Sequence, residues 1–186
     1  MKRYILLAAM AAASFSCRTS QKVSPDEISN KLGQNPHFII DGKASDKSAM
    51  LTMDAEQVAS VTAYFGKDAI KRYGAQAEDG AVEIETIAYS KEKYQQVFKG
   101  ASTEYKIKLE ALGSDSSFQY ILNGKALTKN FEGILAGITP DLLKEIKLVN
   151  SEELRSRYGI GDKQVVVLIS ALPPKSLHKG KEQFNQ

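Results

Sequence analysis

The sequence is poor in the residues from which metal and nucleophilic sites are usually built. Among its 186 residues there are one cysteine, two histidines and no tryptophan. A single cysteine cannot form a disulfide within the chain, and a zinc site needs several cysteine or histidine ligands. The composition therefore predicts neither a disulfide scaffold nor a metal centre, whereas 42% hydrophobic residues are typical of a globular protein.

Long apolar runs and an excess of one charge are also missing. No apolar stretch approaches the roughly 18 residues that span a bilayer, so no transmembrane helix is predicted. The chain has 25 Lys and Arg residues and 22 Asp and Glu residues. If the N-terminal segment that contains Lys2 and Arg3 is removed, the numbers of basic and acidic residues become nearly equal. Nucleic-acid-binding domains normally carry a basic face. The one basic cluster lies in residues 172–186, which we interpret as a solvated tail, so no nucleic-acid partner is predicted.

Residues 1–16 have the order of an export signal. Two basic residues precede an apolar run over residues 5–13, and small residues follow it. The only cysteine, Cys17, comes directly after Ser16. A plain secretory signal that leaves Cys17 as a free thiol is one interpretation of this pattern.

The same segment resembles the lipobox of bacterial lipoproteins, although Ser14 stands where that family usually has Leu. In the family, the cysteine becomes the lipidated first residue of the mature protein. The resemblance implies a lipid anchor at Cys17 that holds the protein on a membrane surface without a spanning helix. Residues 17–35 would then be a linker with a short helix.

A set of short motifs occurs twice at similar spacing, which predicts an internal repeat. The two units are residues 36–89 and 118–171, and residues 90–117 connect them. The paired motif residues are Asp41, Gly42, Tyr73 and Gly74 in the first unit, and Asn123, Gly124, Tyr158 and Gly159 in the second.

Each unit is predicted to contain a strand, a helix, a strand, a helix and a strand, in that order. Apolar runs that end in Asp-Gly or Asn-Gly predict strands closing in tight turns. Helices are expected to begin at Asp54 and Thr139, and a second helix over residues 67–73 ends at a glycine. Closing strands are expected over residues 81–87 and 165–169, with Val82 aligned to Val165. The predicted class is α+β, with mixed sheets and short helices.

The connecting residues 90–117 are predicted to form a helix and an extra strand. Residues 90–99 carry an apolar stripe at helical spacing, and Gly100 is expected to end that helix. Tyr105, Ile107 and Leu109 alternate with charged residues, a pattern typical of a half-buried strand.

The motif order resembles the plug domain of TonB-dependent outer-membrane receptors. The family's plug has an Ile-Asp-Gly strand end, a Tyr-Gly turn and a Gly-Val-Val/Ile-x-Ile-Thr-Thr strand. This sequence has Asp41-Gly42, Tyr73-Gly74 and Gly80-Ala81-Val82-Glu83-Ile84-Glu85-Thr86 at those places. The second unit departs from the pattern at Asn123 and at residues 161–164. The resemblance covers plug-like units alone, so it implies neither transport nor catalytic residues, and the matched motifs are structural.

Candidates for catalysis are few. His37 stands beside Pro36 at a strand start, and no Gly-x-Ser-x-Gly motif accompanies it. Asp46, Asp54 and Glu56 lack the spacing of a calcium loop. Glu83 and Glu85 are two residues apart on a strand and therefore share one face. We expect that face to be exposed to solvent and to contact a partner.

Together these features predict a non-catalytic lipoprotein without a cofactor, anchored in the outer membrane and facing the periplasm. It would serve as a binding or accessory module for an outer-membrane receptor or transport system. A sheet edge of either unit could accept a strand of the partner. A periplasmic hydrolase or a small-ligand sensor with an unrecognised site is the alternative.

Overall fold

A computed structural model describes residues 32–149, 165–173 and 182–184 of the chain. The predictions for Cys17, for the leading helix and for Tyr158 and Gly159 concern residues outside these ranges. Within them, no helix is long and apolar enough to cross a membrane.

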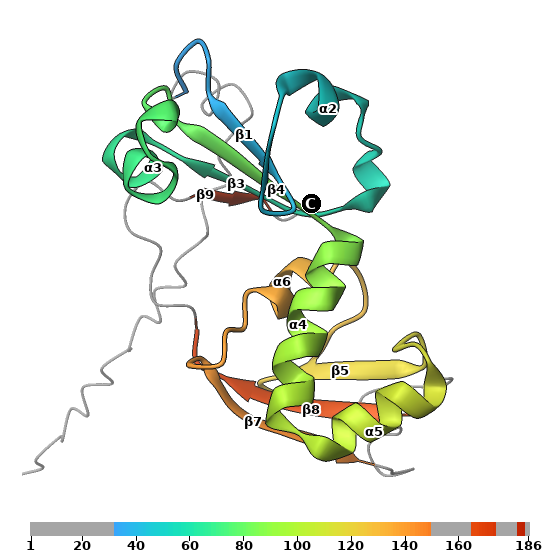
Figure 1. Ribbon diagram of the computed structural model, residues 1–186. Helices are drawn as coiled ribbons and strands as arrows, with labels where there is room; N and C mark the ends of the chain where they lie inside the picture. The colour runs from blue at the N-terminus through green and yellow to red at the C-terminus, as the bar shows by residue number, and fades with distance from the viewer. Residues whose placement is uncertain (1–31, 150–164, 174–181, 185–186) are drawn as a thin grey trace, which may run out of the picture.

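The described strands form two mixed sheets, drawn one above the other in Figure 1. In each sheet two neighbouring strands are parallel, and the other pairs are antiparallel. This arrangement confirms the predicted α+β class with two mixed-sheet units. The first sheet has the order β2 (Lys43–Ser45), β1 (His37–Ile40), β4 (Ala81–Thr86), β3 (Val58–Tyr64), β9 (Glu182–Phe184). The second has the order β6 (Lys125–Ala126), β5 (Phe118–Leu122), β8 (Val165–Ala171), β7 (Leu143–Val149).

The two sheets share their register as well as their strand order. Val61 of β3 lies opposite Ile84 of β4, and Ile146 of β7 lies opposite Ile169 of β8. The structure therefore aligns Ile84 with Ile169, and the predicted alignment of Val82 with Val165 is wrong by two residues. Both outer strands also carry an irregularity near their start, between Val58 and Ser60 in β3 and between Leu143 and Glu145 in β7.

Tight turns close the hairpins where the sequence predicted them. Asp41 and Gly42 have φ values of 51° and 76°, and Asn123 and Gly124 have 48° and 82°. Two successive residues with positive φ match the twist of a two-residue hairpin, and Asp, Asn and Gly adopt that conformation most readily. The turns lead into β2 and β6, two short strands that the sequence analysis did not predict.

The first unit contains the predicted helix α3 (Gly66–Tyr73), which ends at Gly74 with a φ of 87°. Asp54 caps a helix as expected, but that helix is a single 3-10 turn, η1 (Ala55–Gln57). A second 3-10 turn, η2 (Ala75–Ala77), follows α3. Helix α2 (Lys47–Thr52), capped by the Asp46 side chain, was not predicted.

The connecting residues form two helices. Helix α4 (Ile87–Ala101) begins after Thr86, whose hydroxyl accepts the Tyr89 amide proton, and it continues through Gly100. The predicted strand is instead helix α5 (Thr103–Leu112). Its buried residues Tyr105 and Leu109 lie four apart on one helical face, while Ile107 is 62% exposed.

Two further predictions are corrected. Thr139 begins a turn, not a helix, because its carbonyl accepts the amides of Leu142 and Leu143 directly before β7. Among the described residues of the second unit, a helix lies earlier in the chain, at α6 (Glu132–Ala136). The segment interpreted as a solvated tail contains strand β9, which pairs antiparallel with β3.

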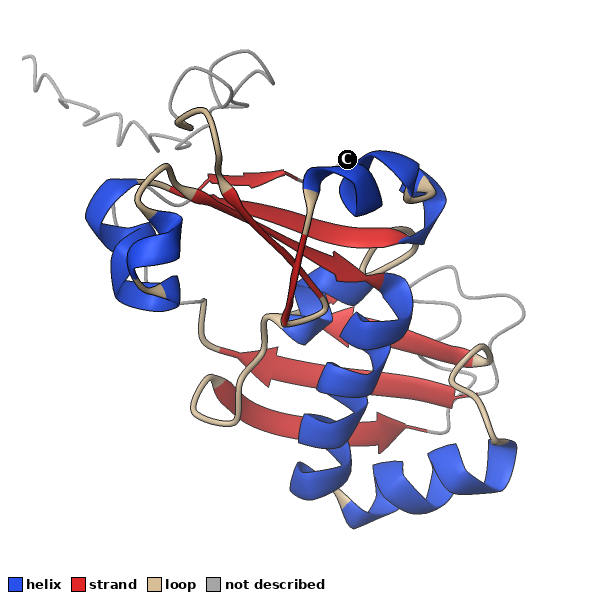
Figure 2. Ribbon diagram, turned by 45° about the horizontal axis from the view of Figure 1, so that its top comes forward, coloured by secondary structure: helices blue, strands red, loops and turns tan. Residues whose placement is uncertain are grey.

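The larger core lies between the second sheet and helices α4 and α5. Figure 2 shows α4 lying across this sheet. Strand β8 is apolar on both faces and is almost wholly buried, as its continuous run predicted. The buried residues of this core are Tyr94, Phe98, Tyr105, Leu109, Phe118, Tyr120, Leu127, Leu135, Ile138, Val165, Val167, Ile169 and Ala171.

The first sheet has a smaller core, built from Ile39, Tyr64, Ala69, Ala77 and Ala81. The two units touch where α6 packs against β3 (Figure 1). A Cβ atom on Gly133 would come within 2.6 Å of the Ala59 carbonyl oxygen, so only glycine allows this close approach.

Candidate functional site

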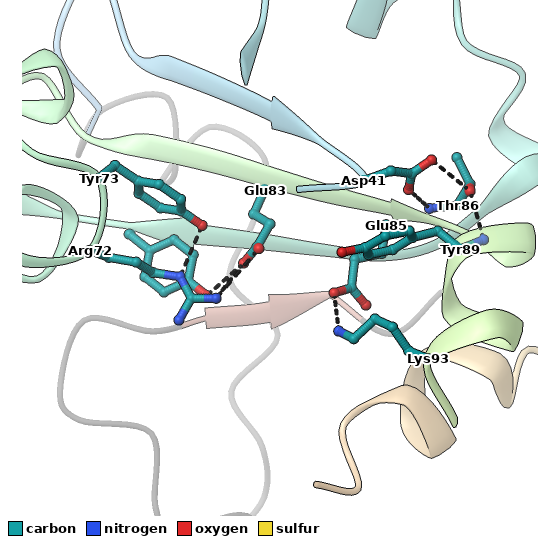
Figure 3. A network of polar contacts seen from close by, with 9 residues as sticks. Asp41, Arg72, Tyr73, Glu83, Glu85, Thr86, Tyr89 and Lys93 are labelled. Carbon is teal, nitrogen blue, oxygen red and sulfur yellow. Dashed lines mark hydrogen bonds and ion pairs between the residues drawn. The ribbon is translucent and has the colours of Figure 1, made fainter. Parts of the chain in front are cut away.

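Glu83 and Glu85 point to the same side of β4, as their spacing predicted, but they are not solvent-exposed (Figure 3). Their side chains are only 15% and 13% exposed. Glu83 accepts the Tyr64 hydroxyl proton at 2.8 Å and lies 3.3 Å from the Arg72 guanidinium. Glu85 forms an ion pair with Lys93 of α4. The prediction of an exposed face is wrong because helices α3 and α4 supply cations that cover the carboxylates.

Arg72 links Glu83 to Tyr73 in a polar network on this face. Its guanidinium carbon lies 4.9 Å from the ring centre of Tyr64 and 5.5 Å from that of Tyr73. Its Nε donates to the Tyr73 hydroxyl at 3.0 Å. Burial and then the neighbouring Glu83 charge raise the pKa of Tyr64, so its hydroxyl keeps the proton that it donates. The Glu83 charge is therefore balanced by Arg72 within the network.

His37 lies beside this network. Its ring centre is 5.9 Å from that of Tyr73, which in turn packs edge-on against Tyr64. In the part of the chain that the structure describes, no group of three or more His, Cys, Asp or Glu side chains could hold a metal ion.

The turn residues Asp41 and Asn123 bond to the end of the parallel neighbouring strand, which is β4 in the first sheet and β8 in the second. Asp41 accepts the Thr86 amide proton at 2.7 Å and the Thr86 hydroxyl proton at 2.9 Å. Asn123 accepts the Ala171 amide proton at 3.0 Å and donates to the Ala171 carbonyl at 3.0 Å. These residues occupy equivalent places in the two sheets and serve the fold.

Asp115 forms a buried cluster that the sequence analysis missed. It is 7% exposed, and its Oδ2 accepts protons from the hydroxyls of Tyr94 at 2.5 Å and Tyr120 at 3.0 Å. The Tyr105 hydroxyl lies 2.9 Å from that of Tyr120, and Lys91 lies 3.7 Å from the carboxylate. Asp115 sits in a Ser-Asp-Ser-Ser stretch that reads as an ordinary turn, so no local signal marks it.

Burial alone would raise the pKa of Asp115, because it penalises the charged carboxylate. Hydrogen bonds from Tyr94 and Gln95, together with the Lys91 charge, outweigh this and lower the pKa below its usual value. Burial raises the pKa of Tyr94, Tyr105 and Tyr120. The cluster therefore holds one negative charge among neutral phenols, which suits a packing role.

The outer edges of the two sheets differ. In the first sheet the edge of β3 carries β9, with Val61 opposite Phe184 and Ala63 opposite Glu182. In the second sheet the equivalent strand, β7, pairs among the described residues with β8 alone. Residues 146–148 of β7 correspond to residues 61–63 of β3.

Two hollows lie beside β7, one where it meets helix α4 and one where it meets helix α5. One, of about 510 Å³, is lined by residues of α4 and the start of β7, including Val97, Leu143 and Ile146. The other, of about 520 Å³, is lined by residues of α5 and the end of β7, including Ile107 and Leu148. This side of the second unit therefore combines a strand edge that no described strand covers with partly apolar surface.

No protein-family model, curated protein or solved structure matches the chain.

Proposed function

We propose that this protein is a non-catalytic lipoprotein of the bacterial cell envelope. Its two plug-like units would form a binding or accessory module for an outer-membrane receptor or transport system, with Cys17 as the site of lipid attachment. The proposal assigns the chain to the outer membrane, facing the periplasm.

The observation that carries the proposal is the duplicated unit. Both sheets have the same strand order, register and β-bulge position, and their motif residues Asp41 and Asn123 hold equivalent strands together. The carboxylates closest to a catalytic pair, Glu83 and Glu85, are engaged by Arg72 and Lys93. The duplicated unit supports the resemblance to plug domains, and the engagement of these carboxylates supports a non-catalytic role.

The anchor is tested by replacing Cys17→Ser and by metabolic labelling with a radioactive fatty acid. The native protein should incorporate the label and sediment with outer-membrane vesicles, whereas the variant should be unlabelled and soluble in the periplasm. An unlabelled native protein, or a variant that stays in the membrane fraction, would contradict lipid attachment.

The partner is tested with a photo-crosslinking residue in intact cells. Leu51 on α2 is a suitable position, because among the described residues it is the most exposed large apolar side chain, at 69%. Lys106 on α5, exposed on the second unit, is the matched control. Adducts with an outer-membrane receptor should form from position 51 and not from position 106. Adducts without any outer-membrane protein would overturn the assignment.

A further inference from the structure

Among the described residues, no strand pairs with the outer edge of β7. Its counterpart β3 accepts β9 at residues 61–63, directly after its β-bulge. Residues 146–148 of β7 stand at the same distance from the equivalent bulge. Bulges and lysines often protect edge strands from pairing. The β3 edge shows that this bulge leaves the following residues free to pair.

The charges along β7 are self-complementary. Lys144, Glu145 and Lys147 are exposed. Within one strand, Lys147 Nζ lies 2.6 Å from Glu145 Oε1. When two copies of one strand pair antiparallel about a two-fold axis, the residue on the axis lies opposite itself. Each residue a given number of positions before the axis lies opposite the residue the same number of positions after it in the other copy. With the axis at Ile146, Glu145 of each copy lies opposite Lys147 of the other.

Neighbouring registers are less favourable. An axis at Glu145 would set two glutamates opposite each other, and an axis at Lys144 or Lys147 would set two lysines opposite each other, which is destabilising. An axis at Leu148 would avoid like charges but would form no cross-strand ion pair between the residues on β7. The register at Ile146 also places an apolar residue on the axis.

We propose that a second copy of this chain pairs with the first through β7. The two β7 strands are antiparallel, with the two-fold axis at Ile146, and the second sheets of both copies join into one continuous sheet. The hollows lined in part by Ile107 and Val97 adjoin this strand. This inference goes beyond the proposed function and does not depend on the lipid or on a receptor.

The interface is small, so the dimer is weak. One strand pair and its flanks bury less than the roughly 1,200 Å² of a standard stable interface. We therefore expect dissociation in the range of about 10 to 1,000 μM, which requires measurement at high protein concentration.

Charge reversal tests the contact directly. Full-length mature protein carrying Cys17→Ser, so that no lipid contributes, is studied by sedimentation equilibrium up to about 1 mM. Glu145→Lys and Lys147→Glu should each weaken the dimer about tenfold, because each creates two like-charge pairs across the axis. The double variant should restore it. Glu78→Lys and Lys43→Glu, at exposed sites of the first unit, are the matched controls and should leave dimerisation unchanged.

Disulfide trapping tests the register. In antiparallel pairs, opposite residues have Cα atoms about 4.5–5.5 Å apart, within the range that a disulfide can bridge. In the same Cys17→Ser background, Ile146→Cys should form a disulfide-linked dimer, whereas Lys147→Cys alone should not. A mixture of Glu145→Cys and Lys147→Cys proteins should form the mixed dimer, and both of these side chains are exposed, so the fold is unaffected.

A chain that stays monomeric at the highest concentration would overturn the proposal. So would a double charge reversal that fails to restore the dimer, or trapping through Lys147→Cys alone. Trapping of a different protein in intact cells through position 147, with no dimer, would assign the edge to another partner and would also overturn it.

Discussion

The Asp41 carboxylate binds both the backbone amide and the hydroxyl of Thr86, 45 residues later in the chain. Thr86 also caps α4, since its hydroxyl accepts the Tyr89 amide proton. One turn residue thus connects the hairpin of the first sheet to the start of the helix that enters the second core. In the second sheet, Asn123 makes the equivalent contact with Ala171 through two hydrogen bonds.

Asp41→Ala should therefore destabilise the protein by about 1–3 kcal/mol, because it removes the partner of a part-buried amide. Asn123→Ala should cost a similar amount. Urea denaturation followed by circular dichroism measures both. Glu78→Ala, an exposed control, should stay within about 0.5 kcal/mol of the native protein. Equal stability of the three variants would mean that the hydrogen bonds of Asp41 to Thr86 and of Asn123 to Ala171 do not stabilise the sheets.

Glu83→Ala should cost about 1–3 kcal/mol, because it removes the carboxylate to which the buried Tyr64 hydroxyl and Arg72 Nη2 both donate. Arg72 is half exposed, so its direct coupling to Glu83 should be at most about 1 kcal/mol. A double-mutant cycle with Arg72→Ala measures that coupling. A loss below about 0.5 kcal/mol for Glu83→Ala would restore the interpretation of Glu83 as an ordinary surface residue.

Asp115 should make the protein acid-sensitive. Its pKa is lowered in the folded protein, so its contribution to the free energy of unfolding is complete above the ordinary aspartate pKa of about 4. That contribution is lost as the pH falls through the lowered pKa. Urea denaturation between about pH 7 and pH 3 should show this loss.

Asp115→Asn should be less stable at neutral pH, by about 1–3 kcal/mol, because the buried hydroxyls of Tyr94 and Tyr120 lose a charged acceptor. Its stability should also fall less steeply below about pH 4 than that of the native protein. Parallel pH profiles for the two proteins would show that another carboxyl group causes the acid sensitivity.

Gly133→Ala should loosen the contact between the two units. The added methyl group would meet the Ala59 carbonyl oxygen at 2.6 Å and the Ser60 Cβ at 3.1 Å, so α6 must shift away from β3. We expect a loss of about 1–3 kcal/mol, as for other overpacked contacts. Gly100→Ala on α4 is the matched control, since a Cβ there meets nothing within 4 Å. It should stabilise the protein by up to about 1 kcal/mol.

Local patterns predicted the parts of this fold that depend on nearby residues. Asp-Gly and Asn-Gly predicted the positive-φ turns, Gly74 predicted the end of α3, and the continuous apolar run predicted the buried strand β8. The prediction failed for α5, where alternating apolar residues resembled a strand. Ser102, which caps α5, and Gly113, which ends it with a φ of 67°, were the local signals that could have identified the helix.

By itself, the sequence determined the two-fold repeat, the turns and most strands, because backbone preferences and apolar spacing act within a few residues. Tertiary structure decided which polar groups are covered, since Glu83 and Glu85 meet Arg72 and Lys93 only when α3 and α4 pack near β4. It also brought the Asp115 carboxylate within hydrogen-bond distance of the Tyr94 and Tyr120 hydroxyls. In the described part of the chain, it paired β9 with β3 but placed no strand on the outer edge of β7. Such contacts join residues distant in the chain, and their energies depend on packing that no local pattern encodes.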